Sequence, residues 1–250
     1  KRILDYERKR LGKWPEFLDD ILHVAKNDVG AGYDILSYDV IKNGRRGSLS
    51  GKLIIKGKQG HIAYPHLASN PIHCSLNALN ELCASAWGDE HPDFPATSLQ
   101  ISNIHAGTGA TNVIPGQLEL SFNFRYSPTT TAQQLMDTTE ALLRRYNLDF
   151  HVEWQHWGEP FLTPEGRLTH VCREVIQEVC GITPKLSTDG GTSDGRYIAK
   201  YCSEVIELGP VNDTIHKVNE RVLIDDLVTL SELYEKILER LLIKEKPDEK

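Results

Sequence analysis

The sequence of 250 residues lacks several features that would place it in a common class of protein. No stretch approaches the ~20 consecutive apolar residues of a membrane-spanning helix, so we expect no membrane partner. A basic excess is also missing, because the formal net charge is −7 at pH 7. Nucleic-acid-binding surfaces usually carry clustered positive charge. We therefore expect a small molecule, rather than a nucleic acid, as the ligand.

Paired cysteines are missing as well. The five cysteines are scattered, odd in number and never spaced as Cys-x-x-Cys. This pattern is typical of a reducing compartment, and it predicts a cytoplasmic protein without a thiolate zinc site. The hydrophobic content of 40% is enough to build buried cores, and the length allows one large or two modest domains.

Hydrophobic periodicity predicts a β-α-β-β-α-β unit in the middle of the chain. Apolar and polar residues alternate without a fault over 117–125 and again over 148–155, which is typical of strands with one buried face. The expected elements are strands at 48–56, 97–104, 117–125 and 148–155, and helices after Pro71 and at 130–146. This order predicts a ferredoxin-like fold with a four-stranded antiparallel sheet.

After Gly158 the pattern changes to alternating helices and short strands. The expected elements are helices at 164–180, 192–200 and 223–242, and strands at 183–187 and 203–208. Such alternation predicts an α/β domain with a parallel or mixed sheet covered by helices. Two short amphipathic helical pieces are expected within residues 1–27. The predicted organisation is an N-terminal segment (1–46), a central domain (47–158) and a C-terminal part (159–250).

Several short segments resemble one enzyme family. They are Lys42-Asn-Gly-Arg-Arg-Gly47, Gly60-His-Ile-Ala-Tyr-Pro-His-Leu-Ala68, Thr111-Asn-Val-Ile-Pro115, Ser187-Thr-Asp-Gly-Gly-Thr-Ser-Asp-Gly-Arg196 and His216-Lys-Val-Asn-Glu220. Together they resemble the bacterial succinyl-diaminopimelate desuccinylases, two-zinc amidohydrolases of the aminoacylase/carboxypeptidase superfamily. The resemblance runs from about Val40 to Leu242. It implies an α/β (α+β) fold in which a ferredoxin-like βαββαβ lid and dimerisation domain precedes the C-terminal part of a zinc-hydrolase catalytic domain.

The resemblance also implies a reaction and a set of binding residues. The reaction is hydrolysis of N-succinyl-LL-2,6-diaminopimelate to succinate and LL-diaminopimelate, a step of lysine biosynthesis. Guanidinium groups suit the carboxylates of such a substrate, although each charge taken singly is typical of a solvated surface. The substrate-binding positions implied by the resemblance are Lys42, Arg45, Ser48, Tyr64, Asn112, Arg125, Gly191, Thr192 and Asn212.

The glycine-rich turn at 190–194 has two interpretations. It precedes a predicted helix, and backbone N–H groups at such a position favour a carboxylate. The same residues are also an ordinary way to build a strand-to-helix turn and its cap. Both interpretations can hold together, and the resemblance assigns Gly191 and Thr192 to binding rather than catalysis.

Two histidines receive roles only through the resemblance. His61 lies in a predicted loop, where a histidine by itself indicates little. The family's equivalent residue reaches across a homodimer and stabilises the oxyanion of the tetrahedral intermediate, a valuable interaction where water is scarce, so His61 is the candidate catalytic residue. His216 follows a predicted strand and resembles a zinc ligand of the family.

The rest of a two-zinc site is missing from the sequence. Such a site needs about five protein ligands, one of them a bridging carboxylate, and a further carboxylate as general base. The family supplies them from a His-x-Asp segment, a bridging Asp, a Glu-Glu pair and another Glu. No His-x-Asp and no Glu-Glu occurs before Lys42, where the only histidine is His23.

Three explanations are open. In the first, the chain is the C-terminal portion of a split, truncated or spliced desuccinylase, and a companion chain is one source of the missing ligands. In the second, it is a non-catalytic relative that dimerises and binds anionic small molecules. In the third, it carries a new metal site built from Asp19, Asp20, His23 and His216. We favour the first, because so many substrate residues remain without their metal partners. A ferredoxin-like regulatory module fused to an unrelated α/β domain would leave the motifs around Gly190 and His216 unexplained.

Overall fold

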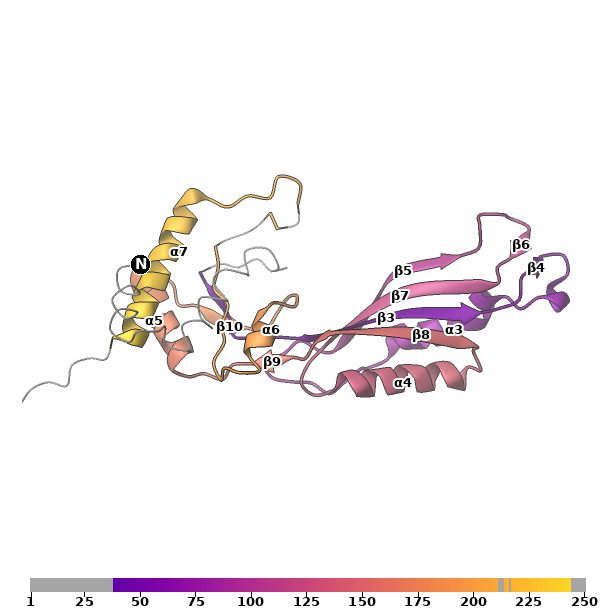
Figure 1. Ribbon diagram of the computed structural model, residues 1–250, viewed down its shortest axis with the longest axis horizontal. Coiled ribbons are helices and arrows are strands. Elements are labelled where there is room, and N and C mark those ends of the chain that lie inside the picture. The colour runs from indigo at the N-terminus through magenta and orange to yellow at the C-terminus, as the bar shows by residue number, and fades with distance from the viewer. Residues whose placement is uncertain (1–37, 211–213, 216, 244–250) are drawn as a thin grey trace, which may run out of the picture. The chain divides into compact units, whose positions relative to one another are not determined.

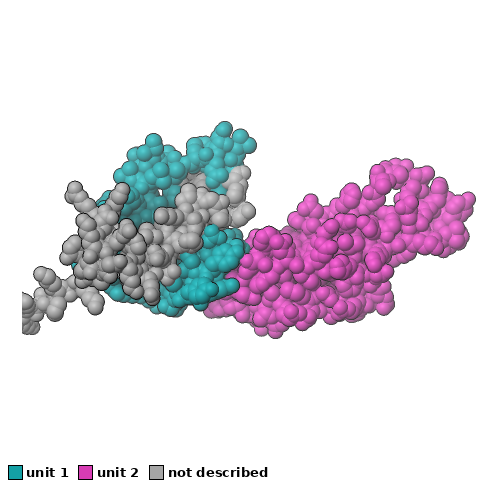
Figure 2. Space-filling view, viewed as in Figure 1, with its two compact units in different colours: residues 1–45, 161–250 teal, residues 46–160 magenta. Residues whose placement is uncertain are grey.

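The computed structural model describes residues 38–210, 214–215 and 217–243, and they divide between two compact units (Figure 2). The first unit comprises Lys1–Arg45 and Phe161–Lys250, and the second comprises Arg46–Pro160. The helical pieces predicted within residues 1–27 lie outside the described residues. No helix in the described ranges has both the length and the apolar character needed to span a membrane.

A four-stranded antiparallel sheet forms the framework of the second unit. Its strands are β3 (Gly47–Lys56), β5 (Ser98–Ala106), β7 (Gln117–Tyr126) and β8 (Phe150–Gly158). They lie side by side in the order β5-β7-β3-β8 (Figure 1). With helices α3 (Pro71–Ala84) and α4 (Ala132–Arg145) in their places along the chain, the unit has the predicted βαββαβ order. The predicted ferredoxin-like fold is confirmed.

The alternation of β7 explains why this sheet has one buried face. Its apolar residues are almost fully buried, and the polar residues between them are partly exposed. The register extends the apolar surface across the sheet, because Leu53 of β3 lies opposite Leu120 and Leu49 lies opposite Phe124. Period-two patterning therefore sets both the strand and the side of the sheet that receives the helices.

Both helices of the second unit begin at positions that the sequence marks clearly. Asn70 caps α3, since its side chain accepts a hydrogen bond from the Ile72 N–H, and Pro71 occupies the first turn. Thr131 caps α4 in a reciprocal arrangement with Gln134, which is the capping box. These caps fix where each helix starts over the sheet.

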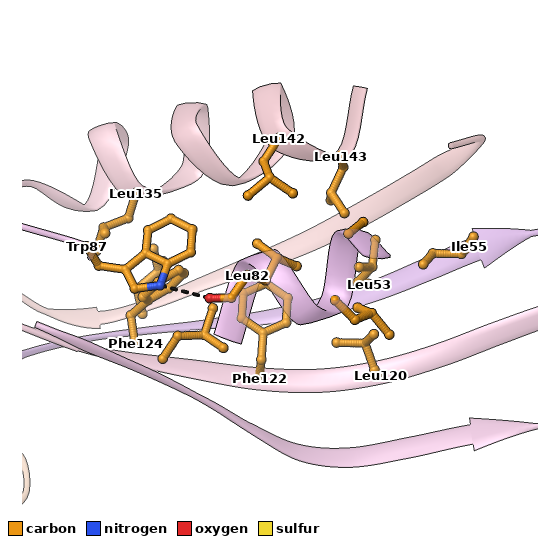
Figure 3. Close-up of a cluster of buried hydrophobic side chains, with 14 of the residues drawn as sticks. Leu53, Ile55, Leu82, Trp87, Leu120, Phe122, Phe124, Leu135, Leu142 and Leu143 are labelled. Atoms are coloured by element: carbon orange, nitrogen blue, oxygen red, sulfur yellow. Dashed lines mark hydrogen bonds between the residues drawn. The ribbon is translucent and has the colours of Figure 1, made fainter. Parts of the chain in front are cut away.

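Leucines and aromatic rings fill the space between the helices and the sheet (Figure 3). Leu135, Leu142 and Leu143 of α4 point toward the sheet, as Figure 3 shows. The indole N–H of Trp87 donates to the carbonyl of Leu82 at 3.1 Å, and the Trp87 ring lies edge-on to Phe124 with centroids 4.7 Å apart. The polar atom of a buried tryptophan is thereby satisfied.

A short ladder extends the second unit beyond the end of β3. Strand β4 (Gly60–His61) pairs antiparallel with β6 (Val113–Ile114), and a short 3₁₀ helix, η1 (Pro65–Leu67), follows β4. The ladder, η1 and the residues that connect β4 to η1 expose several large apolar side chains. They are Ile62, Tyr64, Leu67 and Val113.

The first unit is built on two packed helices and short strand pairs. Helix α5 (Arg167–Cys180) packs against α7 (Ile224–Leu242) around a buried core. Strand β1 (Val40–Lys42) pairs in parallel with β10 (Lys185–Ser187), and β2 (Gly44–Arg45) pairs antiparallel with β9 (Phe161–Leu162). Both parallel and antiparallel pairings therefore occur among these short strands. All five cysteines of the chain are free.

Two predicted elements of this unit are shorter than expected. The strand predicted at 203–208 is reduced to a single bridge between Glu207 and Lys42. The Thr163 hydroxyl donates to the Val205 carbonyl and accepts from its N–H, so a side chain takes the place of a partner strand. The helix predicted at 192–200 is only α6 (Gly195–Ile198).

We predict that the segment of residues 47–158 folds on its own and forms a dimer. Its two helices and four strands share one buried core, and open sheet edges favour pairing with a second copy. Circular dichroism of the isolated segment should show antiparallel sheet with helix, and sedimentation should show a dimer. Loss of the sheet signal would refute independent folding, and a strict monomer at high concentration would refute the dimer.

Candidate substrate-binding site

A glycine-rich turn between β10 and α6 carries two of the predicted binding residues, Gly191 and Thr192. Gly190 has a φ of +101°, a conformation that side chains rarely adopt. Gly191 and Thr192 are both partly exposed. Since α6 has only four residues, a helix dipole contributes little here. Any anion bound at the turn must rely on the N–H groups of the turn itself.

A buried ion pair lies beneath this turn. The Arg45 guanidinium donates from Nε to Glu207 Oε2 at 2.9 Å and forms a second contact with the same oxygen through Nη2. Ser193 donates its hydroxyl to the other oxygen, Glu207 Oε1. Arg45, Ser193 and Glu207 are each at most 4% exposed. The opposite charges neutralise each other inside the unit, which a buried charge requires.

Lys42 and Ser187 continue the polar group at the ends of β1 and β10. Lys42 Nζ donates to Ser187 Oγ at 3.1 Å, and Ser187 Oγ in turn accepts from the Asp189 N–H at 3.1 Å. Lys42 is buried, with 6% of its surface exposed. The structure thus brings Lys42, Arg45 and the glycine-rich turn together within the first unit.

Ser48 and Arg125 form a second group at one end of the sheet in the second unit. They lie directly opposite each other on β3 and β7, and the Ser48 hydroxyl accepts from Asn123 Nδ2 at 3.1 Å. Tyr126, next along β7, donates to Glu159 at 2.9 Å. Burial first, and this hydrogen bond second, raise the pKa of Tyr126 far above its ordinary value. Tyr126 is therefore a neutral donor at neutral pH.

His61, Tyr64 and Asn112 form a third group at the β4–β6 ladder. The Asn112 carbonyl accepts from the Ile62 N–H at 3.1 Å, and the rings of His61 and Tyr64 lie 5.9 Å apart between centroids. His61 Nδ1 accepts from the Ala63 N–H at 3.1 Å. The other ring nitrogen, Nε2, is not used in this bond, and the side chain is exposed. The ring can thus present one nitrogen outside its own loop.

The second and third groups lie at opposite ends of the same strand. β3 contains 10 residues, and a strand rises about 3.3 Å per residue, so its ends lie roughly 30 Å apart. Ser48 is near one end, and the chain reaches His61 only after leaving the other end at Lys56. One small substrate therefore cannot touch both groups within a single copy of this unit.

Two predicted site residues, His216 and Asn212, lie outside the described residues, as do Asp19, Asp20 and His23. Among the residues that the structure describes, no group of three or more His, Cys, Asp or Glu side chains could hold a metal ion. The described part of the chain therefore does not fit a zinc site, and the assignment of His216 as a ligand stays a prediction.

Glu207 is a site residue that the sequence patterns did not single out. One signal was present, because this acidic residue lies within an apolar stretch, Val205-Ile-Glu-Leu208, whose other residues are buried or partly buried. A carboxylate there must have a buried partner. The identity of that partner could not be read locally, since Arg45 is 162 positions away.

Comparison with solved structures shows which known fold this chain shares. The fold is similar to the aminopeptidase PepT from Bacillus cereus ATCC 10987, with a TM-score of 0.66 and 20% identity over 82% of this chain and 54% of that one. The M20 family metallo-carboxypeptidase Sso-CP2 from Sulfolobus solfataricus gives a TM-score of 0.67 and 16% identity over 84% and 61%. Residues 43–151 match the family described as a peptidase dimerisation domain, M20_dimer. The chain thus has the fold of M20 peptidases.

Sequence comparison identifies the family within this class. The chain is 57% identical over 204 residues to a succinyl-diaminopimelate desuccinylase from Alkalilimnicola ehrlichii, covering 82% of this chain and 54% of the relative. The enzyme of the same name from Acinetobacter baylyi is 56% identical with the same coverage. Over this region the chain is a homologue of the succinyl-diaminopimelate desuccinylases, which confirms the predicted resemblance. The chain spans about half the length of these relatives.

Proposed function

We propose that this chain supplies the substrate-binding part of an amidohydrolase that cleaves N-succinyl-LL-2,6-diaminopimelate to succinate and LL-diaminopimelate. The observation that carries this proposal is the 57% identity over 204 residues to a relative named for that activity. The chemistry of the site residues supports it, because the substrate carries several carboxylates. A guanidinium at Arg125 and the backbone N–H groups of the glycine-rich turn suit such groups.

Zinc is the cofactor that the family implies, and when bound it would lower the pKa of a water and polarise the amide carbonyl. The described residues do not hold a metal set, so we derive no step through zinc from them. We propose that His216 provides one ligand and that the others come from the part of the relatives' length that this chain does not span. A companion chain is one source of that part.

We further propose that the active assembly is a homodimer in which His61 serves the partner's site. The match of residues 43–151 to a dimerisation domain supports this. The length of β3 supports it too, because His61 cannot reach the Ser48 and Arg125 group of its own copy. With its Nδ1 occupied by the Ala63 N–H, a His61 ring donating from Nε2 could stabilise an oxyanion.

A second candidate function is binding of anionic small molecules without turnover. The lack of a metal-binding group among the described residues favours it. Mixing the chain with the unmatched half of the Alkalilimnicola ehrlichii relative distinguishes the two functions. Zinc-dependent hydrolysis by the mixture supports the amidohydrolase, and binding of succinate with no hydrolysis by any mixture supports the alternative.

The free cysteines support a cytoplasmic location, which we propose as well.

Replacing Arg125 by lysine should weaken catalysis by the completed enzyme. Lysine keeps the positive charge but loses the planar pair of donors, so kcat/KM should fall by an amount equivalent to roughly 1–3 kcal/mol. Arg144→Lys is the matched control, because Arg144 lies exposed on α4, where its guanidinium pairs with Glu140 and lies over the Phe150 ring. Equal kcat/KM for the two variants would return Arg125 to the class of ordinary surface charges.

A further inference from the structure

Resting on the proposed function, we infer that Glu207 is a positioning residue that holds the glycine-rich turn in the shape that binds a substrate carboxylate. Among the described contacts, the Glu207 side chain bonds Arg45 and Ser193, which flank the partly exposed residues of the turn. It acts on the two sides of the turn, directly through Ser193 and indirectly through Arg45. The residues between these two attachments, Gly190–Thr192, include both predicted binding residues.

The first attachment is the hydrogen bond from the Ser193 hydroxyl to Glu207 Oε1. It fixes the end of the turn just before α6. Gly195 makes this approach possible, because a Cβ there would lie only 2.8 Å from Glu207 Oε1 and 3.2 Å from Ser193 Oγ. A larger residue at 195 would push the carboxylate and the hydroxyl apart.

The second attachment passes through Arg45. While Nε and Nη2 of Arg45 bind Glu207 Oε2, Nη1 donates to the backbone carbonyl of Asp189 at 3.2 Å. Asp189 lies immediately before Gly190. One guanidinium, oriented by one carboxylate, therefore fixes the beginning of the turn.

The carboxylate that orients both attachments is itself held in a fixed position. The Lys42 N–H donates to the Glu207 carbonyl at 3.0 Å, and the Glu207 N–H donates to the Lys42 carbonyl at 2.8 Å. Arg45 follows on the same short stretch of chain as Lys42. Because the backbone of Glu207 and the backbone near Arg45 are bonded together, their side chains have little freedom to separate.

This arrangement differs from two ordinary roles of a buried glutamate. A general base needs an oxygen that can reach a substrate or a water, whereas Glu207 is 4% exposed and each of its oxygens accepts a bond within the unit. A buried ion pair kept only for stability needs no third partner. The bond to Ser193 joins the pair to the turn, and loss of binding geometry is the expected result of cutting it.

The test compares two substitutions that each remove one buried hydroxyl from the first unit of the full 250-residue chain. Ser193→Ala detaches the turn from Glu207 and leaves the Arg45 pair intact. Thr163→Val is the matched control, because Thr163 is similarly buried but its hydroxyl bonds only the backbone of Val205 among the described contacts. The measurements are the dissociation constant for succinate, by calorimetry or NMR titration, and the amide hydrogen exchange of residues 190–192.

Ser193→Ala should raise the dissociation constant for succinate at least about fivefold, which corresponds to the free energy of roughly one hydrogen bond. It should also speed amide hydrogen exchange at residues 190–192. Thr163→Val should change neither by more than about twofold. Glu207→Gln should exceed Ser193→Ala in both measurements; if it does not fold, Ser193→Ala still decides. Equal results for Ser193→Ala and Thr163→Val would overturn the inference.

The exchange measurement separates this inference from the proposed function. If the unaltered chain does not bind succinate, the proposed ligand is wrong for this chain. Faster exchange at residues 190–192 in Ser193→Ala alone would still show that Glu207 positions the turn. Unchanged exchange in that variant would refute the positioning role even if succinate binds.

Discussion

The 250-residue chain alone should hydrolyse N-succinyl-diaminopimelate at least about 10²–10⁴ times more slowly than the Alkalilimnicola ehrlichii relative, the usual effect of losing a general base. Loss of the metal ions would slow it further, because they provide both the nucleophilic water and the Lewis acid. The described residues contain no cluster of three or more His, Cys, Asp or Glu side chains that could hold a metal ion. The family resemblance assigns only His216 as a ligand, and one ligand cannot hold two zinc ions tightly.

The measurement combines zinc content after dialysis with hydrolysis followed by the amide absorbance. The desuccinylase relative is the positive control, and His216→Ala of this chain is the matched variant. Two zinc ions retained per chain, together with turnover that His216→Ala abolishes, would contradict the prediction. That result would favour a new metal site that includes His23 and the neighbouring Asp19 and Asp20.

Leu82→Ala should destabilise the second unit by about 2–5 kcal/mol, the range for removing a buried leucine side chain from a close-packed core. Leu82 is 1% exposed, and Figure 3 shows it among the buried side chains of the core. Its carbonyl also accepts the Trp87 indole N–H. A cavity at this position would therefore weaken the apolar contacts of the core and the packing of the Trp87 ring.

Leu76→Ala is the control for this substitution, because Leu76 lies on the same helix α3 but is 57% exposed. The same change there should alter the free energy of unfolding by no more than about 0.5 kcal/mol. Urea denaturation monitored by tryptophan fluorescence reports on the second unit through Trp87 and Trp154. Similar midpoints for the two variants would show that the described core does not govern the stability of this unit.

The sequence predicted the second unit well because its signals are local. The alternation in β7 and the caps of α3 and α4 depend on residues that are near one another along the chain. The first unit was less predictable. A strand at 203–208 would need a neighbouring strand to bond its backbone. The Thr163 side chain bonds the backbone of Val205 in place of such a strand.

The candidate site shows the same division. By itself the sequence determined the family, the ferredoxin-like unit and the positions of the glycine-rich turn and of the arginines. Only the tertiary structure decided that Arg45 is paired with Glu207 beneath that turn, and that His61 lies a strand's length from Arg125. Periodicity specifies which face of an element is buried, whereas the pairing of charges distant in sequence is set by how the elements pack.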